Sequence, residues 1–190
     1  MKKILCILLL LLTGCSSKTS MIEIQKHVYV EKEFKDSWLE TNEFGDSYIK
    51  EELQGGYHYH FDQQFLEIFF NTGGKIELYN YSIKKNDLII SGEMIPPKTI
   101  RLVHPHLDNV TSEGVIIHEL GHYFDEKHQF SSSKQFTKLY KKYKTLFKQK
   151  TKKEYFAECF KEYVGNHQEK VKPFQSYMET ITKKIRQNNK

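Results

Sequence analysis

The chain has 190 residues, of which 38% are hydrophobic and 28% are charged. It is long enough for one domain with a sizeable core and too short for two comfortable ones. The net charge of +5 is a mild excess, and nothing in the sequence resembles a nucleic-acid-binding module, so no nucleic-acid partner is expected.

The N-terminus has the pattern of a bacterial lipoprotein leader. A basic start precedes a short apolar run at 4–12, which cannot span a bilayer core of about 30 Å as a helix. The tetrad LTGC, ending at Cys15, is similar to the lipobox, whose cysteine is lipidated and becomes the new N-terminus. We therefore expect a signal peptide at 1–14, a polar tether at 15–21 and one domain at 22–190. Loss of Lys2 and Lys3 lowers the net charge to +3, and Cys159 remains as the single unmodified thiol.

The next part of the chain predicts a small sheet. In 22–30 (IEIQKHVYV), apolar residues alternate on one face, which favours a half-buried strand. Segment 62–70 (DQQFLEIFF) predicts a helix that Asp62 caps and NTGG ends. Three short strands are predicted after it, at 75–83, 87–94 and 98–104.

Four helices are predicted in the C-terminal half, at 115–124, 136–147, 154–164 and 174–186. Thr111 or Ser112 could cap the first. In the second, apolar residues recur every three or four positions and lysines occupy the other face. These lysines could favour an anionic surface, although a solvated helix face explains them more simply. The predicted fold class is α+β, a small sheet followed by a helical half.

The first of these helices contains the motif HELGH. His118 and His122 are four residues apart, so both side chains project from one face of a helix and can share a metal ion. Glu119 lies one position round the helix and can act on a metal-bound water without being a ligand. This pattern is typical of zinc peptidases, in which the glutamate is the general base.

The third ligand has two sources in the sequence. His128 has the spacing of the metzincin motif HExxHxxGxxH, but Asp125 replaces the glycine at which the chain turns. Glu154 and Glu158 are four apart in EYFAE and face one way, so that one can bind the metal while the other orients a histidine. Glu154 is also the last residue of a capping box that starts at Thr151.

HELGHYFD followed by EYFAECF resembles the zinc-peptidase domain of the anthrax lethal factor family, which includes the secreted Pro-Pro endopeptidases. That family has the pattern HExGHxxD followed by EFFAE. The resemblance is confined to these two motifs and the order of sheet and helices, in about the last 100 residues. It implies that His118, His122 and Glu154 bind one zinc ion and that Glu119 is the general base.

The resemblance also implies outer roles and leaves one gap. Glu158 would be the carboxylate that orients a ligand, and Asp125 a structural residue. The family places a tyrosine that stabilises the oxyanion seven residues before the glutamate ligand, where this chain has Phe147. Tyr143, one turn earlier, is the nearest substitute, although a core position on its helix explains it slightly better.

Other histidines occur in the pairs His58 with His60 and His104 with His106. Without further ligands at suitable spacing, surface positions explain them better than a second metal site. His104 could instead line a substrate cleft, because its strand precedes the HELGH helix.

We therefore expect a monomeric, lipid-anchored zinc endopeptidase on the outer face of the cytoplasmic membrane, with a peptide or protein substrate. The alternatives are a metzincin-type protease that uses His128, and a binding lipoprotein without catalysis in which zinc stabilises the fold. The sequence leaves the cleavage specificity open, including cleavage between prolines.

Overall fold

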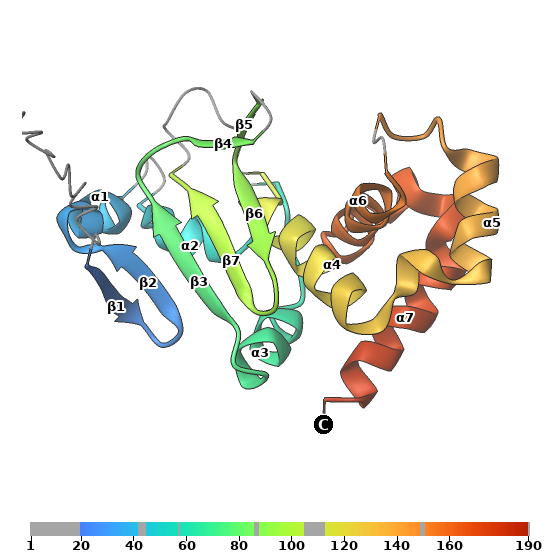
Figure 1. Cartoon of the computed structure of the whole chain (residues 1–190), viewed down its shortest axis with the longest axis horizontal. Helices are drawn as coiled ribbons and strands as arrows, with labels where there is room; N and C mark the ends of the chain where they lie inside the picture. Colours follow the sequence, from blue (N-terminus) through green and yellow to red (C-terminus); the bar gives the residue numbers. More distant parts are fainter. Residues whose placement is uncertain are drawn as a thin grey trace, which may run out of the picture.

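The first half of the chain forms a sheet with short helices, and the second half is helical (Figure 1). The computed structural model describes residues 20–41, 45–56, 58–85, 88–104, 113–148 and 151–189. Within these ranges no helix is long and apolar enough to cross a membrane. The architecture confirms the predicted α+β class. The predicted leader and Cys15 lie outside the described residues.

Five strands form the main sheet, in the order β1-β2-β3-β7-β6. The strands are β1 (Met21–Gln25), β2 (Val28–Glu31), β3 (Lys75–Tyr79), β6 (Gly92–Ile95) and β7 (Thr99–Val103), and a separate pair consists of β4 (Ile83–Lys85) and β5 (Leu88–Ile90). The inner strands β2, β3 and β7 are parallel, whereas β1 and β6 run antiparallel to their neighbours at the two edges. Alternate residues of the inner strands, among them Val28, Ile76 and Ile100, are fully buried. One face of the sheet is therefore packed against the core, while residues of the other face, such as Glu77 and Arg101, are only partly buried.

The segment 22–30 is a hairpin, which corrects the prediction of one strand. β1 and β2 pair antiparallel, with Ile22 opposite Val30 and Gln25 opposite Val28. Between them His27 adopts φ 67°, a left-handed conformation that occurs at the third residue of tight turns. The alternation of apolar residues continues through the turn, so periodicity alone could not locate it. The predicted strands at 75–83 and 87–94 are likewise each divided in two, whereas β7 confirms the strand predicted at 98–104.

The helices are α1 (Lys35–Leu39), α2 (Tyr48–Leu53), α3 (Gln64–Asn71), α4 (Val115–His128), α5 (Lys134–Tyr143), α6 (Lys152–Val164) and α7 (Gln175–Gln187). Four of them confirm the helices predicted by the apolar periodicity of the C-terminal half. α3 confirms the helix predicted near Asp62, whose carboxylate accepts a hydrogen bond from the backbone of Gln64. Short 3-10 segments precede α1, α5 and α7, with three residues before α1 and α5 and seven before α7.

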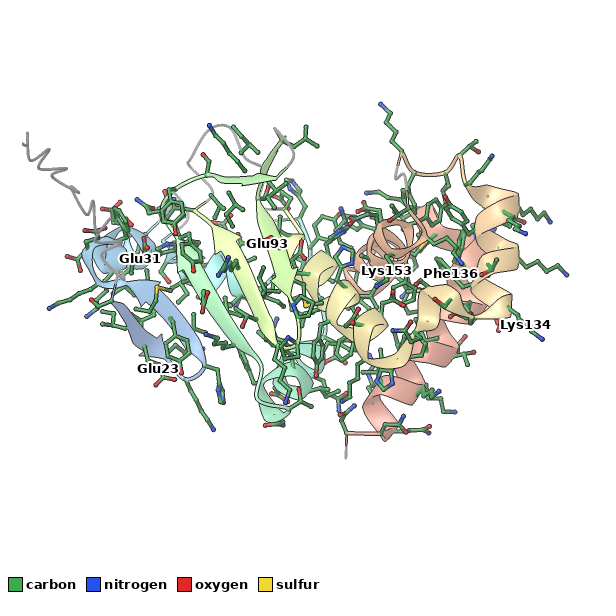
Figure 2. All side chains as sticks on the ribbon, in the orientation of Figure 1. Glu23, Glu31, Glu93, Lys134, Phe136 and Lys153 are labelled. Carbon is green, nitrogen blue, oxygen red and sulfur yellow. The ribbon has the colours of Figure 1, made fainter. Side chains whose placement is uncertain are left out.

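α5 presents its lysines to solvent and its aromatic face to the other helices. Ser133 caps it by accepting a hydrogen bond from the backbone of Phe136, which is fully buried. Figure 2 shows Lys134 on the outside of this helix. The helix ends at Tyr143, four residues earlier than predicted. Leu146 beyond it is 42% exposed, so burial does not favour a further helical turn there.

Candidate metal centre

α4 carries the HELGH motif between the sheet and the other C-terminal helices, beside β6 and α6 (Figure 1). Gly114 precedes its first residue with φ 69°, a conformation that glycine adopts without steric cost, and its backbone N–H donates to Gly55. The predicted caps Thr111 and Ser112 lie outside the described residues. Because His118 and His122 are one turn apart, both imidazoles face α6.

α6 supplies the facing carboxylates. Thr151 caps the helix by accepting a hydrogen bond from the backbone N–H of Glu154, as a capping box predicts. The carboxylate of Glu154, however, extends to the two histidines of α4 and is within 3.3 Å of each. The cap and the contact with the histidines therefore coexist.

Three ligand-type atoms converge at this point. Nε2 of His118 and Nε2 of His122 are 3.1 Å apart, and Oε2 of Glu154 is 3.3 Å from both. A tetrahedral ion with bonds of about 2.0–2.1 Å separates its ligand atoms by about 3.3–3.4 Å. The three side chains thus fit a zinc-sized ion almost without movement. They form the one group of at least three potential ligands in the part of the chain that the structure describes.

A close approach of the two helices makes this convergence possible. A Cβ atom at Gly121 would lie 3.0 Å from Cα of Ala157 and 3.2 Å from Cβ of Phe160. Gly121 stands between the two histidines on α4, and Ala157 lies one turn after Glu154 on α6. Small residues at this crossing let the backbones come near enough for a short glutamate to reach both imidazoles.

Glu119 is buried beside the cluster, with 6% of its surface exposed. Burial raises the pKa of its carboxyl group, while the imidazoles of His118 and His122 and a backbone hydrogen bond with Met94 on β6 act in the opposite direction. The net effect raises the pKa above its usual value, so the carboxylate is a stronger base than an exposed glutamate.

Without a metal ion the cluster is a network of hydrogen-bonded ion pairs. Burial lowers the pKa of His118, but hydrogen bonds with Glu154 and Glu158 outweigh it and raise the pKa to about 9. Hydrogen bonds from the two histidines hold the pKa of Glu154 well below its usual range. The carboxylate is therefore deprotonated at neutral pH, the state that binds metal.

Glu158 contacts the outer side of His118. Its Oε2 is 3.2 Å from Nδ1 of His118, and its Oε1 is 2.7 Å from the ammonium of Lys161. Burial raises the pKa of Glu158, but the hydrogen bond with His118 and the charge of Lys161 outweigh it and lower the pKa to about 2. The geometry is that of a carboxylate orienting a ligand histidine.

A cleft of about 680 Å³ opens over the cluster. β6 and the end of β5 form one wall, and α4 and the start of α6 form the other. The walls include Leu88, Ile90, Gly92, Met94, His118, Glu119, His122 and Glu154. A second hollow of about 310 Å³ shares Ile90, Gly92, His118 and Glu119 with it and continues toward Lys161. Space is thus available on both sides of the cluster.

His128 does not reach the cluster. α4 continues without a turn through Asp125 to His128, and ten residues of helix place His128 about 15 Å along the axis from His118. Its ring packs against Phe130 at 5.0 Å. The buried carboxylate of Asp125 accepts hydrogen bonds from the backbone and hydroxyl of Ser131 at 2.6 and 2.7 Å. Asp125 therefore has the structural role that the motif implies, and it stabilises the turn after α4.

The structure places Tyr143 away from the cleft. It lies at the end of α5, with its ring 6.0 Å from that of Phe174 and its carbonyl bonded to the hydroxyl of Tyr155. Phe147 packs on Tyr155 as well. Neither is among the residues lining the cleft, and no tyrosine of the described residues lines it.

Within the described part of the chain, neither histidine pair of the sequence, His58 with His60 or His104 with His106, supplies a residue that lines the cleft. His104 is buried, its Nε2 lies 3.2 Å from the carbonyl oxygen of Ser37, and the rings of Trp38 and Tyr48 pack around it. This corrects the expectation that His104 lines the cleft. β7 pairs on both sides, with β3 and β6, and the edge strand β6 takes the place beside α4. His58 contacts Glu113 at 2.9 Å, and His106 lies outside the described residues.

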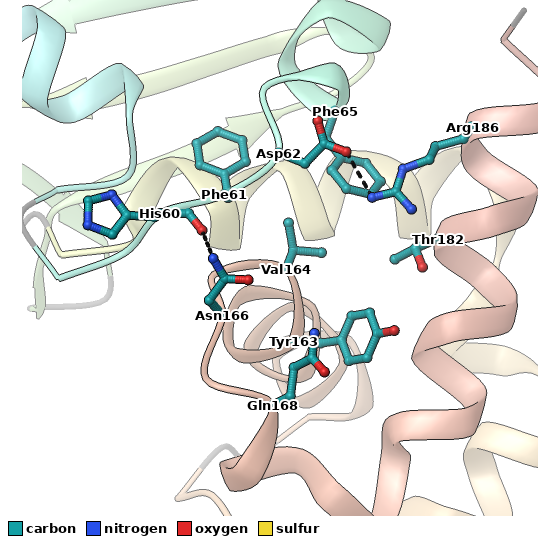
Figure 3. A pocket seen from close by; sticks show the side chains of 10 residues that line it. All are labelled: His60, Phe61, Asp62, Phe65, Tyr163, Val164, Asn166, Gln168, Thr182 and Arg186. Carbon is teal, nitrogen blue, oxygen red and sulfur yellow. Dashed lines mark hydrogen bonds and ion pairs between the residues drawn. The ribbon is translucent and has the colours of Figure 1, made fainter.

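A separate cavity of about 490 Å³ lies between the chain before α3, the end of α6 and α7 (Figure 3). Arg186 points to Asp62 at 2.9 Å, and Asn166 donates to the carbonyl of His60. The one positive and the one negative side chain neutralise each other, and the lining shares no residue with the cleft over the metal ligands. This cavity therefore contains none of the potential metal ligands, which lie in the cleft at His118, His122 and Glu154.

Comparison with known proteins finds the fold but not the family. No family model matches the sequence, and no curated protein matches it. Among solved structures, the chain is similar to the Pro-Pro endopeptidase PPEP-2 of Paenibacillus alvei, with a TM-score of 0.50 and 16% sequence identity. The match covers 63% of this chain and 84% of that one. The chain therefore shares the fold of a Pro-Pro endopeptidase.

Proposed function

We propose that the protein is a zinc-dependent endopeptidase of the gluzincin type. The observation that carries this proposal is the convergence of His118, His122 and Glu154 at the spacing of zinc ligands, with the buried Glu119 beside them in an open cleft. The fold shared with a Pro-Pro endopeptidase supports it. So does the motif pair HELGHYFD and EYFAECF, by which we propose a place in the lethal factor family.

In the proposed hydrolysis, the metal ligands and Glu119 have separate roles. A bound zinc ion would lower the pKa of a water molecule to about 7 and polarise the substrate carbonyl. Glu119 lies where it would accept a proton from the attacking water, and the hydroxide left behind would add to the carbonyl carbon of the scissile peptide bond. Glu119 next delivers the proton to the leaving amine. Burial favours the first of these steps, because it raises the proton affinity of this carboxylate.

An extended substrate can bind along β6. This strand forms one edge of the main sheet and lines the cleft beside the metal ligands. A peptide lying along it can form backbone hydrogen bonds as an added strand, which aligns one carbonyl with Glu119. Leu88, 67% exposed, and Ile90 line the same cleft and favour apolar substrate side chains.

We further propose that Cys15 carries a lipid and that the enzyme acts outside the cytoplasmic membrane on a peptide or protein. The LTGC tetrad after an apolar run supports this. Replacement of Cys15 by serine should abolish labelling with a radioactive fatty acid. Labelling that persists in this variant would contradict the proposal.

The deciding experiment exposes a diverse peptide library, including Pro-Pro sequences, to zinc-loaded wild type and to Glu119→Gln. Wild type should cleave a subset of peptides, and Glu119→Gln should bind zinc but cleave none. Glu126→Gln is a matched control, because it removes a carboxylate that lines the cleft on the same helix but pairs with Lys153. Full zinc occupancy without cleavage of any peptide would instead favour a binding protein in which zinc stabilises the fold.

A further inference from the structure

Lys161 places a largely buried ammonium group next to the metal centre. Its side chain is 16% exposed, and Nζ lies 2.7 Å from Oε1 of Glu158, which faces it from one turn earlier on α6. The other oxygen of Glu158 contacts Nδ1 of His118. Lys161 is thus the third member of a chain of contacts that begins at a metal ligand.

The chain of contacts determines which nitrogen of His118 is free. A neutral imidazole that donates its Nδ1–H to a carboxylate presents the lone pair of Nε2, and Nε2 of His118 is the atom that faces His122 and Glu154. Glu158 can do this only while its own carboxylate is held in place. Lys161 holds it by binding the oxygen that His118 does not use.

The stem of Lys161 is itself confined. A Cβ atom at Gly114 would lie 2.9 Å from Cδ and 3.1 Å from Cγ of Lys161, so the stem packs directly over the start of α4. Its ammonium also lies 5.5 Å from the ring centre of Tyr59. A confined side chain loses little further entropy when it binds Glu158, which makes the contact persistent.

A second carboxylate near Lys161, that of Glu162, already has other partners. Glu162 lies 3.7 Å from Nζ of Lys161, but it also accepts the hydroxyl of Tyr59 at 2.8 Å and contacts Lys170 at 3.1 Å and His167 at 3.3 Å. The charge of Lys161 is therefore directed mainly to Glu158, its shortest contact.

We propose that Lys161 is a positioning residue of the metal centre: it fixes Glu158, and through Glu158 it orients His118 for metal binding. This inference rests on the proposed zinc site. It also predicts the direction in which zinc affinity changes when the lysine is removed. A lysine that acted only through its charge would repel a divalent cation, so its removal would tighten zinc binding, whereas the loss of a positioning residue weakens it.

The experiment measures zinc affinity by competition with a chromogenic chelator, using the full domain and no substrate. Lys161→Met keeps the length of the stem and removes the ammonium, and it should weaken zinc binding about tenfold, at the lower end of the effect of outer partners. Lys161→Arg should restore most of the affinity, because a guanidinium can bind the same carboxylate oxygen. In Glu158→Gln, which lacks the carboxylate, adding Lys161→Met should weaken binding no further.

Lys153→Met is the matched control, because Lys153 also lies on α6 and borders the cleft but forms its ion pair with Glu126 on α4. It should leave zinc affinity unchanged or slightly raised. Thermal unfolding of the metal-free variants shows whether each one folds, and Lys161→Arg provides a folded comparison. If wild type binds no zinc, the proposed function fails. If wild type binds zinc and Lys161→Met binds it equally or more tightly, the positioning role is refuted while the proposed function stands.

Discussion

Replacement of Gly121 by alanine tests the link between helix packing and the metal centre. A Cβ atom there would lie 3.0 Å from Cα of Ala157, whereas carbon atoms normally approach to about 3.5–4.0 Å. α4 and α6 must then separate by about half an ångström at their crossing. Glu154 lies one turn from that crossing on α6, so its carboxylate moves away from His118 and His122.

Two effects of opposite sign determine the stability of Gly121→Ala. Overpacking a well-packed contact costs about 1–3 kcal/mol. Alanine in place of a helical glycine returns about 0.5–1 kcal/mol. The expected result is a loss of about 1 kcal/mol in the free energy of unfolding, or about 2–4 °C in Tm. Gly121→Val should lose more, since it adds two methyl groups at the same point.

The metal centre should respond more strongly than the fold. Zinc sites tolerate ligand displacements of about 0.2 Å, less than half of the expected shift. Zinc affinity should therefore fall by about tenfold or more in Gly121→Ala, comparable to the loss of an outer partner. Urea unfolding of the metal-free protein and chelator competition measure the two effects separately. Ser176→Ala, an exposed position on α7, is the control and should change neither. A Gly121→Ala protein that is more stable than wild type and binds zinc as tightly would show that Gly121 does not set the distance between α4 and α6.

Two further predictions concern single side chains. Glu154→Gln should weaken zinc binding by at least about 100-fold in a metal analysis, because it removes a charged ligand, whereas His128→Ala should leave zinc bound; the opposite pattern would support a metzincin-type site. In the sheet, burial raises the pKa of Glu77, but hydrogen bonds from Lys75, Tyr79 and Arg101 outweigh it and lower the pKa below 4.5. The ionised Glu77 therefore stabilises the fold above that pH, and this stabilisation is lost as the pH falls through the pKa that Glu77 has in the folded protein. Urea unfolding should show a smaller loss of stability in acid for Glu77→Gln than for wild type, and equal losses would contradict this role of Glu77.

Helices and strands could be predicted where the spacing of apolar residues along the chain followed a single period. The apolar spacing located α4, α6 and α7, since a helical stripe needs only neighbours in sequence. It failed at the hairpin of β1 and β2, because the same alternation continues through the turn at His27. It also extended α5 beyond Tyr143, where Leu146 has the right spacing but no buried surface to pack on.

The strand beside α4, the helix that carries HELGH, was not predictable from chain order. The nearest strand in sequence, β7, lies inside the sheet, and the hairpin partner β6 turns back to form the edge. His104 follows β7 into the core, where it contacts Ser37 and Trp38. Pairing between strands is decided by contacts far apart in sequence, and periodicity along one strand carries no information on them.

Local spacing along the chain was sufficient to predict half of the candidate metal centre. Spacing of four on a helix was enough to bring His118 and His122 together, and the same spacing put Glu154 and Glu158 on one face of another helix. Packing between distant segments established which carboxylate meets which histidine, and it placed His128 and Tyr143 away from the cluster. It also added Lys161 to the contacts of Glu158. The physical reason is that helix geometry is local, whereas the distance between α4 and α6 depends on how closely Gly121 and Ala157 allow the two backbones to approach.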